Sequence, residues 1–156
     1  MQVRELRVSY RARDELDFDA RKRLATPSEA ASLLIPLLQH ELVEVFLILC
    51  LSTKQRLICI HEVSRGTLDS TLVHPREVFR AAALANAASI VLAHNHPSGD
   101  PTPSPDDVAL TARLVNAGAV MGIDVVDHIL IADSRYYSFS EGGRLTFGKY
   151  SEGAAR

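Results

Sequence analysis

The pattern of apolar and polar positions divides the chain into short apolar runs and longer amphipathic segments. Runs rich in β-branched residues predict strands at 44–52, 56–64, 88–93, 123–132 and 136–140. Amphipathic segments that carry a proline at the first helical position predict helices starting at Pro27, Pro75 and Pro105. Because helices and strands alternate along the chain, the pattern indicates an α/β fold.

Capping and breaker residues set the expected boundaries of these elements. Residues 26–29 form a capping box for a helix that continues to about residue 39, and Pro36 should kink or shorten that helix. The third helix should reach about residue 117, with Gly118 and Gly122 bracketing its end. The first two strands should form a hairpin, and β-branched residues continue through 66–73.

The segment from His94 to Asp107, HNHPSGDPTPSPDD, places metal-binding side chains at the end of a predicted strand. His94 and His96 are two residues apart, so they project from the same face of an extended backbone. Three prolines and a glycine then form an ordered loop up to Ser104, which fits the N-cap of the next helix, with Pro105 at its first position. Asp107, at the third helical position, points back toward the two histidines. Two imidazoles and one carboxylate suit zinc and leave a fourth position for water, as in catalytic sites.

Each of these residues also has a purely structural interpretation. Ser104-x-x-Asp107 is itself a helix capping box, and a single histidine at a strand end is usually a polar surface residue. A closed structural zinc site would need a fourth protein ligand. Cys50 and Cys59 lie in apolar runs without a CxxC arrangement, so we expect them to be buried apolar residues instead.

The spacing His94-x-His96-Pro97, followed by Ser104-x-x-Asp107, resembles the JAMM motif of MPN-type zinc metalloproteases. The segments HPREV, LAHNHPSGDPTPS and DHILIAD are similar to the bacterial RadC branch of that superfamily, and the similarity covers about residues 44–145. The resemblance implies a single JAB/MPN-type (cytidine-deaminase-like) domain at 26–147, with a mixed β-sheet flanked by helices. Residues 1–25 would then be an N-terminal strand or arm, and residues 148–156 a frayed tail. Longer RadC proteins carry an additional N-terminal helical region, for which we expect no room here.

The resemblance also implies roles for individual residues. His94, His96 and Asp107 would hold one Zn²⁺ ion, Ser104 would support the oxyanion, and an upstream glutamate would act as the general base. Glu44, followed by Val45-Phe46, fits the family's E-x-F pattern. Glu41 is a rival three residues earlier, and Glu62 matches the pattern less well.

Other polar residues near these segments have open roles. His74 precedes a helical proline, so its expected role is to start that helix. His128 alternates with apolar residues on a strand, which favours a hydrogen-bonded core histidine or one that supports a metal ligand. The roles of Asp127 and Asp100 stay undecided.

Composition narrows the class of protein. The 156 residues are 47% hydrophobic with a formal net charge of −2, which suits one globular domain and argues against a general polyanion binder. The sequence contains no apolar run long enough to span a bilayer and no signal-peptide core, and we expect a cytoplasmic protein without membrane contact.

Three classes of function fit these observations. The leading interpretation is a zinc-dependent hydrolase that cleaves an amide, peptide or isopeptide bond in a peptide or protein substrate. The alternative is a non-catalytic binding module in DNA repair or mobile-element biology, although the sequence contains no basic helix or aromatic platform for nucleic acid. A metal-bearing pseudoenzyme is the third. Iron and manganese accept the same ligands as zinc, and a homodimer through a sheet edge is consistent with the sequence.

Overall fold

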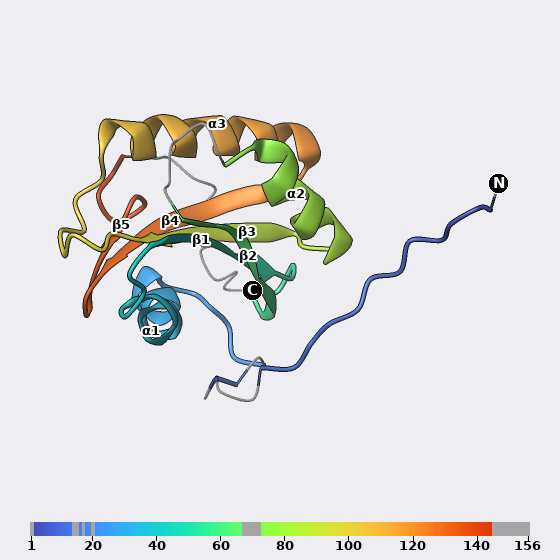
Figure 1. The fold of residues 1–156 in the computed structure, drawn as a ribbon, viewed down its shortest axis with the longest axis horizontal. Helices are drawn as coiled ribbons and strands as arrows, with labels where there is room; N and C mark the ends of the chain where they lie inside the picture. Colours follow the sequence, from blue (N-terminus) through green and yellow to red (C-terminus); the bar gives the residue numbers. More distant parts are fainter. Residues whose placement is uncertain (1, 14–15, 17, 20, 67–72, 145–156) are drawn as a thin grey trace, which may run out of the picture.

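A five-stranded mixed sheet forms the centre of the computed structural model, which describes residues 2–13, 16, 18, 19, 21–66 and 73–144 (Figure 1). The strands are β1 (Glu44–Leu51), β2 (Leu57–Gly66), β3 (Ser89–Asn95), β4 (Asp124–Ala132) and β5 (Arg135–Ser138). Their order in the sheet is β2-β1-β3-β4-β5. β3 and β4 run parallel, whereas the other neighbouring strands are antiparallel. The α/β fold with a mixed sheet is therefore confirmed.

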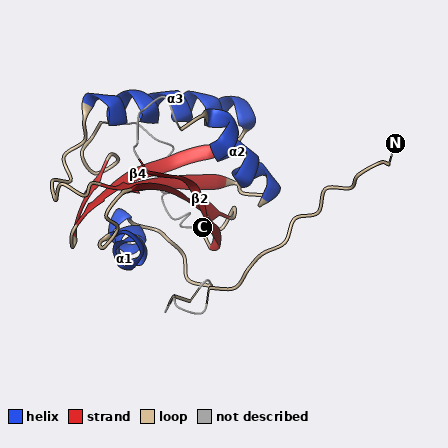
Figure 2. Ribbon diagram, viewed as in Figure 1, coloured by secondary structure: helices blue, strands red, loops and turns tan. Residues whose placement is uncertain are grey.

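Three helices cover the two faces of this sheet (Figure 2). α1 (Pro27–Leu38) packs on one face, and α2 (Pro75–Leu84) and α3 (Pro105–Met121) pack on the other. Alternate residues of β1 and β3 serve the two faces, because successive side chains of a strand point in opposite directions. Val45 and Val91 belong to the core under α1, whereas Phe46 and Leu92 belong to the core under α2 and α3.

The helix starts follow from the capping chemistry expected from the sequence. The Thr26 hydroxyl accepts a hydrogen bond from the Glu29 N–H at 3.2 Å, and the Glu29 carboxylate accepts one from the Thr26 N–H at 3.2 Å. Helix α1 continues through Pro36 and ends at Leu38, one residue short of the expected end. Pro75 and Pro105 each occupy the first turn of their helix, where the missing N–H of proline costs no hydrogen bond.

The strand boundaries differ from the expectation by at most two residues. β1 and β2 form the expected hairpin, and the turn places Gln55 at a φ of 57°. β3 extends through His94 and Asn95, because β1 and β4 pair with that end of it. β5 is a short strand that ends at Ser138. In the β-branched segment predicted at 66–73, residues 67–72 lie outside the described residues.

The expected end of α3 was wrong. Gly118 lies inside the helix, which runs on to Met121 and ends at Gly122 with a left-handed φ of 69°. A Cβ at Gly118 would lie 2.5 Å from the Ile123 carbonyl oxygen and 3.2 Å from the Phe79 ring. The glycine is therefore required by close packing between α3, α2 and the start of β4, and it does not terminate the helix.

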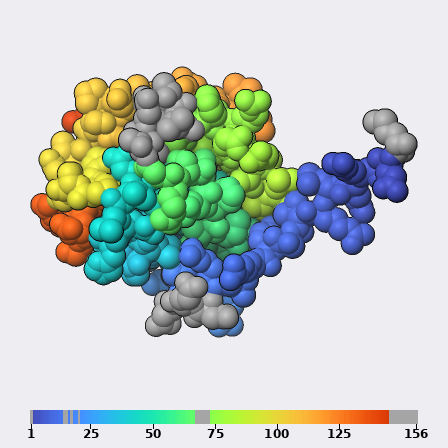
Figure 3. Space-filling view, viewed as in Figure 1, coloured from blue at the N-terminus to red at the C-terminus, as the bar shows by residue number. Residues whose placement is uncertain are grey.

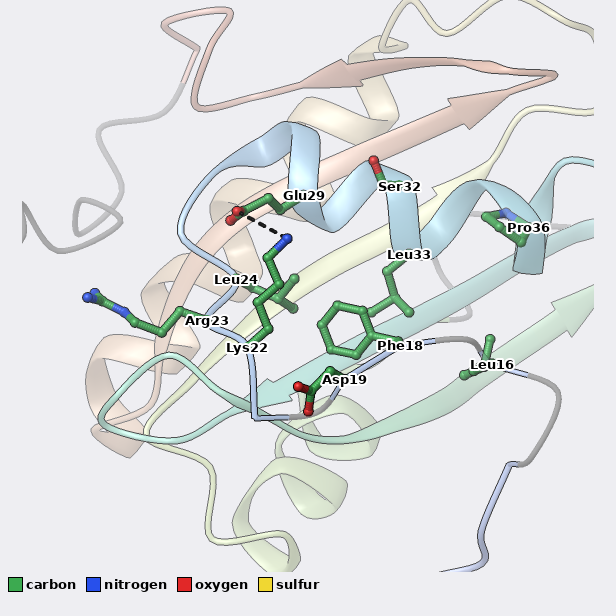
Figure 4. A pocket seen from close by; sticks show the side chains of 10 residues that line it. All are labelled: Leu16, Phe18, Asp19, Lys22, Arg23, Leu24, Glu29, Ser32, Leu33 and Pro36. Carbon is green, nitrogen blue, oxygen red and sulfur yellow. Dashed lines mark ion pairs between the residues drawn. The ribbon is translucent and has the colours of Figure 1, made fainter.

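The N-terminal residues lie outside the layered body. Residues 2–13 extend away from the sheet, and among the described residues before α1 the only strand-like pairing is one bridge between Arg23 and Arg56 (Figures 1 and 3). The expected arm is thus present, whereas the expected strand is absent from its described part. Closer to the body, Phe18 packs toward Leu33 of α1, and Lys22 lies 4.0 Å from Glu29 (Figure 4). The predicted frayed tail at 148–156 lies outside the described residues.

Within the part of the chain that the structure describes, no helix has both the length and the apolar character needed to cross a membrane.

Gly118→Ala should lower the free energy of unfolding by about 1–3 kcal/mol, because the added methyl group meets backbone and ring atoms that cannot withdraw. Asn116→Ala, on the exposed side of the same helix, is the matched control and should leave stability unchanged or raise it slightly. Urea unfolding of both variants measures the difference. A Gly118→Ala protein as stable as wild type would show that helix propensity, and not packing, governs this position.

Candidate metal centre

A cavity of about 300 Å³ lies where β3 ends, β1 begins and α3 starts. Its lining includes His94, His96 and Asp107, together with Glu44 and Ser104. The antiparallel pairing of β1 with β3 brings the first residues of one strand to the last residues of the other. Five side chains singled out from the sequence therefore meet in one cavity.

The three expected ligands converge within this cavity. The Nε2 atoms of His94 and His96 lie 2.9 Å apart. The two carboxylate oxygens of Asp107 lie 3.1 Å from His94 Nε2 and 3.3 Å from His96 Nε2. One ligand atom from each residue falls within 4.8 Å of the others, a cluster that could hold a metal ion. Nitrogen and carboxylate donors at this separation suit a divalent transition metal.

Asp107 reaches the histidines through the capping box that starts α3. The Ser104 hydroxyl accepts a hydrogen bond from the Asp107 N–H at 3.1 Å, and Asp107 Oδ2 accepts one from the Ser104 N–H at 2.7 Å. The capping box expected from the sequence is therefore present, and it leaves the Asp107 carboxylate beside the two histidines. The cap fixes the carboxylate, and its Oδ1 atom remains directed at His94.

The loop between β3 and α3 determines the orientation of the His96 ring. Its Nδ1 donates to the Asp100 carbonyl oxygen at 2.8 Å, and a carbonyl can only accept. When His96 is neutral, its Nε2 therefore carries a lone pair that faces the cavity. Gly99 shapes this loop with a φ of 83°.

The charges in the cluster shift two pKa values in opposite directions. The pKa of His96 is raised, mainly by its hydrogen bond to the Asp107 carboxylate. Burial acts to raise the pKa of Asp107, but the contacts of its carboxylate with the His94 and His96 rings outweigh burial and hold that pKa well below its usual range. A carboxylate held in its charged form is the state that binds a cation.

His128 is the buried, hydrogen-bonded histidine that the sequence suggested. Its Nε2 lies 2.8 Å from His94 Nδ1, and its Nδ1 lies 2.6 Å from Thr111 Oγ1. Burial lowers the pKa of His128 well below its ordinary value. The sequence analysis missed Thr111, although its position four residues after Asp107 places it on the same side of α3.

Of the three glutamates considered as the general base, Glu44 is the one that lines the cavity. The β1–β3 pairing ends at Phe46 and His94, so Glu44 lies two residues beyond that pair, at the end of the sheet from which His96 follows. Both rivals instead bind the Arg65 guanidinium, Glu41 at 2.6 Å and Glu62 at 2.9 Å. Glu44 lines the cavity, and its charge makes a further small contribution to the raised pKa of His96.

Asn95 holds the backbone on both sides of Glu44, a role that the sequence analysis did not anticipate. Its Oδ1 accepts from the Val45 N–H at 2.7 Å, and its Nδ2 donates to the Val43 carbonyl oxygen at 2.9 Å. Asn95 points to the opposite face of β3 from His94 and His96. The residue between the two histidines therefore secures the position of Glu44 from behind the sheet.

The remaining polar residues are placed away from the three ligands or serve the scaffold. His74 is the N-cap residue of α2 without a side-chain cap, consistent with the expected helix start. Asp127 is buried and accepts a hydrogen bond from Ser138 Oγ at 2.6 Å, which ties β4 to β5. Cys50 and Cys59 face each other across β1 and β2, with Cys50 buried as expected and Cys59 only partly so.

Comparison with known proteins places this arrangement in a family. A sequence model of the RadC-like JAB domain matches residues 24–144. The chain belongs to the RadC-like JAB domain family. This JAB domain is 40% identical over 125 residues to a UPF0758 protein of Methanosarcina barkeri, a match that covers 80% of this chain and 55% of the relative. It is 46% identical over 122 residues to one of Clostridium perfringens, covering 78% and 54%.

A third UPF0758 protein, from Desulforudis audaxviator, is 48% identical over 118 residues, or 76% of this chain and 51% of the relative. The JAB domain described here therefore spans about half the length of the curated relatives it matches.

With divalent metal removed by chelation, the stability of this JAB domain should depend on pH through Asp107 and His96. The folded pKa of Asp107 is depressed, so its contribution is complete above the unfolded value of about 3.9 and is lost as the pH falls. The folded pKa of His96 is raised, so its contribution is complete below the unfolded value of about 6.5 and is lost as the pH rises through the folded pKa.

Asp107→Asn removes the charged partner, so both dependences should weaken in urea unfolding measured between about pH 3 and pH 9. Superimposable pH profiles for wild type and Asp107→Asn would contradict this assignment.

Proposed function

We propose that this JAB domain is a metal-dependent hydrolase that cleaves an amide, peptide or isopeptide bond, with zinc as the metal. The observation that carries the proposal is the convergence of His94, His96 and Asp107 on one cavity that Glu44 also lines. Two nitrogen ligands and one carboxylate leave a position open, which is typical of catalytic zinc sites. Iron(II) and manganese(II) accept the same donors, so metal analysis decides the identity of the ion.

A metal ion held by these residues would act as a Lewis acid toward water and the scissile carbonyl group. Glu44 would accept the proton of the attacking water at its carboxylate as the new C–O bond forms. It would then deliver that proton to the leaving nitrogen as the C–N bond breaks, which yields a carboxylic acid and an amine. The proposed peptide or protein substrate provides this bond.

Ser104 would assist at the developing oxyanion. Its oxygen accepts the Asp107 N–H, so its own hydroxyl proton can still be donated to a substrate oxygen. A donor that is already held in place stabilises the charge that appears in the transition state. The capping box thus fixes the ligand Asp107 and the donor Ser104 in one structure.

The first test is metal binding. Protein purified without added metal should contain about one equivalent of a divalent ion, and His96→Ala or Asp107→Ala should remove it. Asp100→Asn is a matched control, because Asp100 lies in the same loop but its carboxylate accepts the Thr102 N–H and is outside the ligand cluster. Elemental analysis and titration with Zn²⁺ measure occupancy. Full occupancy in the His96 and Asp107 variants would overturn the ligand assignment.

The second test separates a hydrolase from a binding module. Glu44→Gln should retain metal and fold but lower turnover about 100- to 10,000-fold on a substrate found by peptide and isopeptide screening. Glu41→Gln is the control, because it changes only the ion pair with Arg65 and should cost far less activity. Cleavage by Glu44→Gln at the wild-type rate would refute the role of Glu44 as general base.

A further inference from the structure

A chain of hydrogen bonds runs from α3 through the core to the buried side of His94. It links the Asp107 carbonyl oxygen to Thr111 Oγ1 at 2.5 Å, Thr111 Oγ1 to His128 Nδ1 at 2.6 Å, and His128 Nε2 to His94 Nδ1 at 2.8 Å. Thr111 and His128 have no exposed surface, and the exposed fraction of His94 is 2%. These side chains are therefore shielded from water, and the donor and acceptor capacity of each group decides where the protons of the hydrogen-bond series lie.

The direction of the chain is fixed at its α3 end. A backbone carbonyl can only accept a hydrogen bond, so the Thr111 hydroxyl must use its single proton to donate to Asp107. The Thr111 oxygen is then left as an acceptor toward His128. It follows that His128 Nδ1 carries a proton and donates it to Thr111.

The direction of hydrogen-bond donation that is set at Thr111 also determines the bond between His128 and His94. His128 is completely buried between the rings of Phe46 and Phe139, with ring centroids 5.6 and 5.0 Å away, an apolar setting in which a second ring proton is costly. A His128 ring protonated at Nδ1 alone has a lone pair on Nε2. That lone pair can only accept, so His94 must donate from Nδ1.

We propose that Thr111 and His128 are positioning residues that hold His94 in the Nδ1–H tautomer, so that its Nε2 lone pair faces His96 and Asp107. The inference rests on the proposed function, because this tautomer is useful only if His94 binds a metal ion. The tautomer itself can be measured in the metal-free protein. The Nε2–H tautomer is a real competitor, because that proton could be donated to Asp107 Oδ1 only 3.1 Å away. Such a hydrogen bond would occupy His94 Nε2 and the Asp107 carboxylate, both of which a metal ion would need as ligands.

The test compares two variants of Thr111 in the full chain. Thr111→Val keeps the shape of the side chain but removes the hydroxyl, whereas Thr111→Ser keeps the hydroxyl. The ring nitrogens are observed by NMR of metal-free protein with ¹⁵N-labelled histidine, above the raised pKa of His96. Wild type and Thr111→Ser should show His94 protonated at Nδ1 and unprotonated at Nε2. Thr111→Val should show the Nε2–H form appearing at His94.

Metal affinity is the second readout, measured by titration with Zn²⁺ alone. Residues that orient a metal-ligating histidine typically contribute about 10- to 100-fold in affinity, so Thr111→Val should lose that factor and Thr111→Ser should retain wild-type affinity. His128→Phe keeps an aromatic ring between Phe46 and Phe139 but provides no acceptor, and it should lose at least as much.

The outcomes separate this inference from the proposed hydrolase. A wild-type protein with His94 protonated at Nε2, or a Thr111→Val protein with unchanged tautomer and affinity, overturns the positioning role and leaves the metal site intact. The tautomer change in Thr111→Val combined with no Zn²⁺ binding by wild type supports the positioning role and overturns the metal-dependent function.

Discussion

The reciprocal hydrogen bonds between Ser104 and Asp107 are the interaction on which the geometry of the site depends. Every polar group of Asp107 has a defined partner: its N–H and Oδ2 bond to Ser104, its Oδ1 faces His94, and its carbonyl oxygen accepts from Thr111. A helix start is a rigid place for a ligand, because the capping bonds leave the side chain little rotational freedom. The N-terminus of α3 is also the end of the helix that favours a negative charge.

The central strands β1 and β3 provide the second constraint on the geometry of the site. β1 and β3 are buried on both faces and pair from Phe46–His94 to Leu51–Ser89, so the relation between the start of one and the end of the other is fixed by the core. Asn95 adds hydrogen bonds that hold the backbone beside Glu44. The proposed general base, metal ligands and oxyanion donor would thereby be arranged before any substrate binds, which is the condition for efficient catalysis in a rigid site.

Local signals account for what the sequence predicted well. The two-residue spacing of His94 and His96 and the three-residue spacing of Ser104 and Asp107 each describe neighbours within one strand or one helical turn, so the ligand cluster was accessible without a fold. The choice among the three glutamates needed the register of β1 against β3 and the ion pairs of Arg65, which are long-range facts. Asn95 gave no signal because its partners, Val43 and Val45, are distant in sequence. Thr111 gave only its spacing from Asp107, and its contact with His128 required the fold.

The predicted end of α3 was wrong for a related reason. Gly118 suggests a helix end when only its low helix propensity is considered. A glycine is in fact required there because a side chain would collide with Ile123 and Phe79. A glycine required by packing and a glycine required by a left-handed φ look identical in a sequence. Gly122 is the second kind, and the two stand four residues apart in the same segment.

The two histidines of the proposed metal site would both need an Nε2 lone pair facing the cavity, but they lie in opposite environments. His96 is partly exposed on the loop, and a single backbone carbonyl, that of Asp100, is enough to direct its Nδ1 proton away from the cavity. His94 reaches the cavity from the core, where the nearest acceptor is another titratable ring, and that ring must itself be directed by Thr111. Changes around Asp100 should therefore reach the site through His96, whereas changes in the core around Phe46 and Phe139 should reach it through His94.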